Sequence, residues 1–85
     1  MTPYQETTAR LREVNAALVS DEAKADRQMY EQLADEQITL MNRAVSLLAR
    51  SLVDQAAQSA HHFTLSPEAA LDLAHDTLVR SGLVW

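Results

Sequence analysis

Five polar residues in the middle of the chain have the types and the spacing to bind anionic groups. Arg43 and Arg50 stand seven positions apart, which places both side chains on one face of a helix. The neutral side chains of Thr39, Asn42 and Ser46 belong to the same polar strip. Guanidinium groups form paired hydrogen bonds to carboxylates and phosphates. We therefore predict that the polar strip (Thr39, Asn42, Arg43, Ser46 and Arg50) binds a partner's carboxylates or a phosphate-bearing ligand.

A second interpretation of the polar strip is that it only faces solvent. In that case Arg43 would form a surface ion pair with Glu36, and Arg50 would form one with Asp54. In the binding interpretation, a two-fold axis near the strip would bring four guanidinium groups together in a homodimer. The sequence leaves both interpretations open.

Tyr30 and Trp85 are further candidates for contact with a partner protein, because tyrosine and tryptophan are enriched in interface hot spots. Tyr30 lies in the first half of the predicted central helix. Trp85 follows Gly82, whose turn can fold the chain back, so Trp85 could instead close the core.

The acidic residues could bind a metal ion for hydrolysis. Helical nucleotide hydrolases hold Mg²⁺ with several inward carboxylates, and Glu31 and Asp35 share a helix face at i and i+4. A second pair would have to come from Asp72 and Asp76 across the fold. A solvated acidic face is the simpler interpretation.

The three histidines do not form a metal signature. His61 and His62 are adjacent, so on a helix their side chains point about 100° apart. His75 shares a face with Asp72 and could bind metal or move protons with it, although a solvated histidine explains the same spacing. The sequence predicts no catalytic residue, no metal ligand and no cofactor.

Composition narrows the class of protein. Of 85 residues, 47% are apolar, which is too many for a disordered chain. A net charge of −5 argues against nucleic acid and anionic membranes as partners. No apolar run reaches the ~18 residues of a membrane span, and the first residues lack the basic and apolar regions of a signal peptide. With no cysteine, these features favour a cytoplasmic protein.

The spacing of apolar and capping residues predicts one all-α domain over residues 1–85 with three helices. Helix 1 spans about 3–19, with Thr2 as cap and Pro3 in the first turn. A long central helix spans about 21–62, with Ser20 as a cap if it separates from helix 1. Helix 3 spans about 67–81, capped by Ser66 and ended by Gly82 in a Schellman motif.

The central helix is apolar on nearly every side between residues 38 and 53, so one neighbouring helix cannot cover it. At ~1.5 Å per residue it would reach roughly 60 Å, beyond the width of a small domain. We therefore expect an elongated homodimeric helical bundle, with a monomeric three-helix bundle as the alternative. The heptad-like spacing predicts a dimer seam of Ile38, Met41, Val45, Leu48 and Leu52.

These features favour a small acidic interaction module that binds another protein as a regulator, inhibitor or assembly factor, and not an enzyme. The alternative is an oligomer that holds a nucleotide or another small anion between subunits. A helix-turn-helix DNA binder ranks last, because helix 3 carries Glu68, Asp72 and Asp76 against Arg80 alone.

Overall fold

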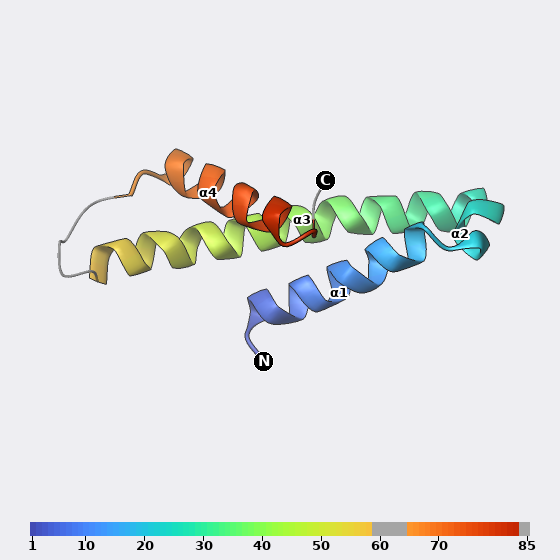
Figure 1. Cartoon of the computed structure of the whole chain (residues 1–85), viewed down its shortest axis with the longest axis horizontal. Helices are drawn as coiled ribbons and strands as arrows, with labels where there is room; N and C mark the ends of the chain where they lie inside the picture. Colours follow the sequence, from blue (N-terminus) through green and yellow to red (C-terminus); the bar gives the residue numbers. More distant parts are fainter. Residues whose placement is uncertain (59–64, 84–85) are drawn as a thin grey trace. The chain divides into compact units, whose positions relative to one another are not determined.

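The chain is all-helical in the part that the computed structural model describes, residues 1–58 and 65–83. The helices are α1 (Pro3–Leu18), α2 (Asp21–Ala25), α3 (Arg27–Gln58) and α4 (Pro67–Arg80), drawn in Figure 1. The residues divide into two compact units, Met1–Arg43 (unit 1) and Ala44–Trp85 (unit 2), with the boundary inside α3. The predicted helical class and long central helix are confirmed, and each unit is described below by itself.

In unit 1, α1 begins with a capping box. Thr2 accepts a hydrogen bond from the backbone N–H of Gln5 at 3.1 Å, and the Gln5 side chain accepts one from the backbone N–H of Thr2 at 3.0 Å. Two hydrogen-bonded N–H groups at the helix start leave fewer unsatisfied donors, which stabilises the first turn. The prediction of Thr2 as cap and Pro3 in the first turn is confirmed.

The buried face of α1 combines aliphatic residues with two threonines, whose hydroxyls are satisfied within the helix. Thr7 donates to the carbonyl of Pro3 at 2.7 Å, and Thr8 donates to the carbonyl of Gln5 at 3.1 Å. These bonds let both side chains be buried without an unpaired polar atom. The buried positions of α1 are Thr7, Thr8, Leu11, Val14 and Leu18.

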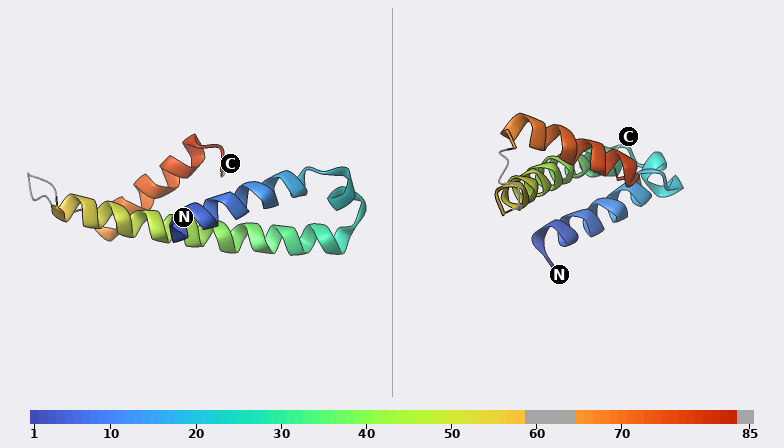
Figure 2. Two further views of the ribbon diagram at one scale, coloured as in Figure 1. Left: turned by 90° about the horizontal axis from the view of Figure 1, so that it is seen from below. Right: turned by 60° about the vertical axis from the view of Figure 1, so that its left-hand side comes forward.

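Polar contacts join α1 to the unit 1 part of α3. Arg10 forms two parallel hydrogen bonds to the Glu36 carboxylate, with Nε–Oε1 at 2.7 Å and Nη2–Oε2 at 3.1 Å. The side-chain amide of Gln37 donates to the Oδ1 atom of Asn15 at 2.8 Å. These contacts set the register of α1 against α3, which run side by side in unit 1 (Figure 2).

The central helix is not continuous from residue 21, contrary to the prediction, because the backbone is extended at Asp26 (φ −118°, ψ 102°). Of the two alternatives that the sequence leaves open for Ser20, the structure shows the cap: Ser20 begins α2 and accepts from the backbone N–H of Ala23 at 3.3 Å. The Asp26 carboxylate then accepts from the backbone N–H of Met29 at 3.2 Å and starts α3. Aspartate favours this capping position over a helix interior. Residues 59–62 of the predicted helix lie outside the described residues.

In unit 2, α3 and α4 pack along a seam of small residues. Ala49, Ala70 and Ala74 are buried and form the core cluster. Side chains this small let two helix axes approach closely. The larger residues pack around this cluster and stay partly buried; they are Val45, Leu48, Leu52, Val53 and Leu65.

Both predicted ends of the last helix are confirmed. Ser66 caps α4, accepting from the backbone N–H of Ala69 at 3.2 Å. At the other end Gly82 adopts φ +75°, a left-handed conformation that glycine allows without steric cost. The N–H of Leu83 donates to the Leu78 carbonyl, and that of Gly82 donates to the Val79 carbonyl, both at 3.1 Å. This is the Schellman pattern, and it brings Leu83 into a buried position.

Candidate functional site

All five residues of the polar strip are exposed on α3. Thr39, Asn42 and Arg43 belong to unit 1, and Ser46 and Arg50 belong to unit 2. The Thr39 hydroxyl donates to the backbone carbonyl of Asp35 at 3.1 Å, so its one donor is already used within its own helix. Exposure is compatible with both interpretations of the strip. The two interpretations differ in whether Arg43 and Arg50 form ion pairs.

The ion pairs expected of a purely solvated strip do not form among the described residues. Glu36, the expected partner of Arg43, binds Arg10 instead. Arg50 forms no ion pair with Asp54 among the residues described. Within residues 1–58 and 65–83, Arg43 and Arg50 therefore present guanidinium groups that no carboxylate neutralises, whereas Arg10, Arg27 and Arg80 are each paired.

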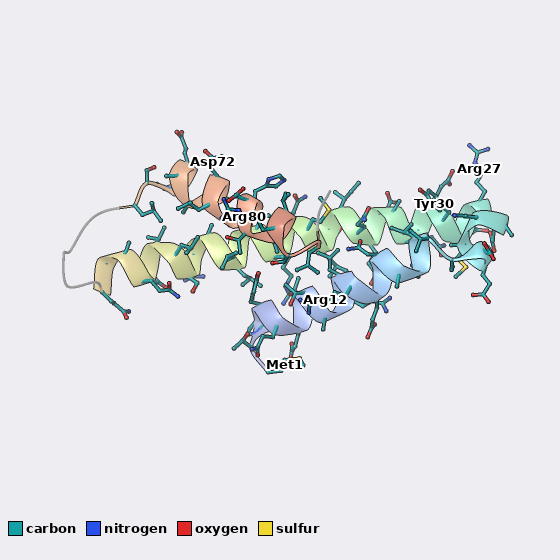
Figure 3. All side chains as sticks on the ribbon, viewed as in Figure 1. Met1, Arg12, Arg27, Tyr30, Asp72 and Arg80 are labelled. Atoms are coloured by element: carbon teal, nitrogen blue, oxygen red, sulfur yellow. The ribbon has the colours of Figure 1, made fainter. Side chains whose placement is uncertain are left out.

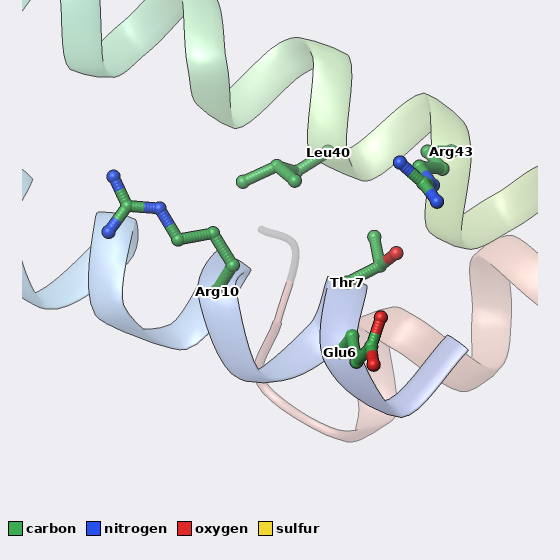
Figure 4. Close-up of a pocket in the computed structure, with 5 residues that line it drawn as sticks. All are labelled: Glu6, Thr7, Arg10, Leu40 and Arg43. Carbon is green, nitrogen blue, oxygen red and sulfur yellow. The ribbon is translucent and has the colours of Figure 1, made fainter. Parts of the chain in front are cut away.

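Unit 1 also contains an open hollow that includes Arg43. Its volume is about 220 Å³, and it is lined by Glu6, Thr7, Arg10, Leu40 and Arg43 (Figure 4). Three of these residues come from α1 and two from α3.

Arg10 contributes to the hollow with its charge already neutralised. Its guanidinium bonds to Glu36 and, through Nη1, to Glu13 at 3.1 Å. These hydrogen bonds, that to Glu36 first, raise the pKa of Arg10 above its ordinary value, so the group stays charged. The guanidinium points away from Glu6 and Thr7, which leaves the apolar stem of Arg10 nearest to them (Figure 4).

The predicted dimer seam is covered to different degrees along its length. Ile38 is 54% exposed and Met41 is half-buried, both in unit 1. Val45, Leu48 and Leu52 pack against the alanine cluster of unit 2 and remain partly buried. The structure therefore places three seam residues against the chain's own unit 2 core, and their contact with a second copy stays a prediction.

Of the two aromatic candidates, Tyr30 lies within the described residues. Tyr30 is 46% exposed on α3 in unit 1, close to Arg27, whose side chain extends away from the helix (Figure 3). Trp85 lies outside the described residues. Tyr30 is therefore the aromatic candidate that the structure places at a surface.

The acidic and histidine candidates do not gather among the described residues. Glu31 pairs with Arg27 at 3.1 Å, and Asp76 pairs with Arg80 at 3.0 Å. Asp72 and His75 are exposed on α4, and His61 and His62 lie outside the described residues. In the described part of the chain, no three histidine, cysteine or acidic side chains lie close enough to hold a metal ion.

The sequence does not predict four of the five residues of the hollow: Glu6, Thr7, Arg10 and Leu40. Their proximity depends on how α1 packs against α3, and no local pattern encodes that register. The one signal in the sequence is a charge pattern, since Arg10 and Glu13 at i and i+3 mark a charged face of helix 1.

No protein-family model, curated protein or solved structure matches this chain. Among the helices described, none is both long enough and apolar enough to cross a membrane.

Proposed function

We propose that the chain is a protein-binding module that acts in the cytoplasm as a regulator, inhibitor or assembly factor. It forms a homodimer through the seam of α3 and binds a partner's carboxylates through the polar strip. The observation that carries this proposal is the pair of exposed arginines, Arg43 and Arg50, which have no ion-pair partner among the described residues.

The charge state of the strip supports a partner with acidic groups. An unpaired guanidinium at a surface is hydrated and offers its full set of donors to an incoming carboxylate. Paired arginines such as Arg27 and Arg80 must first lose a carboxylate to do the same. Binding of an acidic patch by the strip therefore breaks no existing ion pair, whereas binding by these paired arginines does.

Incomplete burial of large apolar side chains supports the homodimer. The buried positions of α3 are all alanines, Ala44, Ala49 and Ala56, whereas Ile38 is 54% exposed. Further burial of aliphatic surface stabilises an interface by about 25 cal/mol per Å² before the costs of association. A second copy is the partner that offers the same apolar residues in equal number.

Charge reversal tests the partner-binding role. In a capture experiment from the native host, the double variant Arg43→Glu, Arg50→Glu should lose the partner, because each carboxylate then repels the partner's acids. The matched control is Arg12→Glu, since Arg12 is exposed on α1 and unpaired among the described residues. Far-ultraviolet circular dichroism should show the same helicity in all three proteins. Unchanged capture by the double variant would remove the strip from the proposal.

The second candidate function is an oligomer that holds a nucleotide or another anion between subunits, which the same unpaired arginines favour. A phosphate compound that binds only the native state would raise the melting temperature with its concentration. Thermal denaturation with and without ATP separates the two functions. Stabilisation by ATP that disappears with Arg43→Glu would favour the anion binder over the partner-binding module.

A further inference from the structure

The hollow between α1 and α3 in unit 1 holds two opposite charges that are not paired with each other. Glu6 on α1 and Arg43 on α3 both line it. Among the described residues neither side chain forms an ion pair or a hydrogen bond. A surface cation and a surface anion that line one hollow, without touching, are complementary to a ligand that carries both charges.

The remaining lining residues define what lies between the two charges. The Thr7 hydroxyl already donates its proton to the Pro3 carbonyl at 2.7 Å, so toward a ligand it can only accept. Leu40 and the methylene groups of Arg10 supply apolar surface, because the Arg10 guanidinium is bound to Glu36 and Glu13. Figure 4 shows Glu6 and Thr7 together on one side, and Arg43 across from them on α3. The acceptors of the hollow therefore come from α1, and a donor group comes from α3.

The size of the hollow limits the ligand. Its volume of about 220 Å³ is small for a ligand site. Sites for larger organic ligands span about 300–1,000 Å³. A compound with a short aliphatic chain therefore matches this hollow better than a ligand as large as a nucleotide.

We propose that this hollow binds a small zwitterion of the amino-acid class. The ligand's carboxylate lies on the Arg43 guanidinium, its ammonium group donates to Glu6 and to the Thr7 hydroxyl oxygen, and its aliphatic part contacts Leu40. This site lies within one chain and does not depend on the partner-binding role proposed above. Glu6→Gln separates the two, because it removes the ammonium contact and leaves the polar strip unchanged.

Titrations followed by nuclear magnetic resonance test this site with L-leucine and glycine as probes. We expect saturable shifts of Thr7, Leu40 and Arg43 signals with an amino acid. The single-charge analogues of leucine, 4-methylpentanoate and 3-methylbutylamine, should bind at least about tenfold more weakly, because each lacks one charge-assisted contact. Glu6→Gln and Arg43→Gln should each weaken binding to a similar extent, whereas the control Arg12→Gln should not.

Three results would overturn the proposal. One is the absence of saturable shifts with both amino acids. Another is inorganic phosphate or 4-methylpentanoate binding as tightly as leucine, which would make the hollow a simple anion site. The third is equal affinity of leucine for the Glu6→Gln variant and the unaltered protein. Since Glu6 and Arg43 are exposed, neither glutamine variant should fail to fold, and unchanged melting temperatures would verify this.

Discussion

Arg10 is the residue that ties α1 to α3 within unit 1. Its guanidinium holds Glu36 through two parallel hydrogen bonds and Glu13 through a third. Bidentate geometry makes this pair stronger than a single surface contact, although exposure of both side chains, 51% and 37%, allows water and salt to screen it.

Replacing Arg10 tests the strength of this tie. We expect Arg10→Gln to lower the melting temperature modestly, and the loss to shrink at high salt because screening weakens the native ion pair. Because the pKa of Arg10 is raised, its charge is fully present at neutral pH, and on the alkaline side its contribution is lost only in strong alkali. Thermal denaturation at low and high ionic strength measures the effect. Equal losses in Arg10→Gln and the unpaired control Arg12→Gln would contradict the role given to the Glu36 pair.

Unit 2 depends on small residues where α3 meets α4. Ala70 and Ala74 are fully buried beside Ala49, whereas Leu73 on the same helix is 49% exposed. The packing of α4 therefore places its alanines, and not all of its leucines, against α3.

Enlarging a seam residue should separate the two helices. We expect Ala74→Leu to lower the free energy of unfolding by about 1–3 kcal/mol, because the added carbons have no space in a packed core. Leu73→Ala, a change of the same size in the opposite direction at an exposed position, should alter it by less than about 0.5 kcal/mol. Urea denaturation measures both. A stabilising Ala74→Leu would mean that the seam is not closely packed.

Local signals in the sequence predicted the helix ends well and the contacts between helices poorly. Thr2, Ser66 and Gly82 act on their own turns, so their roles follow from residue type and position alone. The sequence does not single out Asp26, which lies among other acids; its extended backbone and the hydrogen bond from the Met29 N–H to its carboxylate mark it as a cap. The bond between Arg10 and Glu36 spans 26 positions, and only the packed fold defines it.

The sequence predicts the residues of the polar strip but not the ion-pair state of its arginines. Helical periodicity gave Arg43 and Arg50 a common face, and both are exposed. Periodicity within α3 could not show that Glu36 turns toward α1, which leaves Arg43 without its expected partner. The hollow beside Arg43 was missed for the same reason.

The two compact units share α3, and the sequence predicts that they behave as one domain. Breaking one unit would then fray the helix on which the other is built, so we expect a single cooperative unfolding transition. In a Trp85→Phe variant, tyrosine fluorescence reports on Tyr4 and Tyr30 in unit 1, and circular dichroism at 222 nm reports on all helices; the two should give the same urea midpoint. Separated midpoints would show that the units unfold independently.

In the proposed function, the chain binds a protein through α3 as a homodimer. Native mass spectrometry of the protein purified gently from its own host measures the oligomeric state and any bound protein together. We expect a dimer that carries a second protein, a dimer without that protein for Arg43→Glu, Arg50→Glu, and a monomer for Ile38→Asp. A bare monomer of the unaltered protein would contradict both the seam and the proposed function.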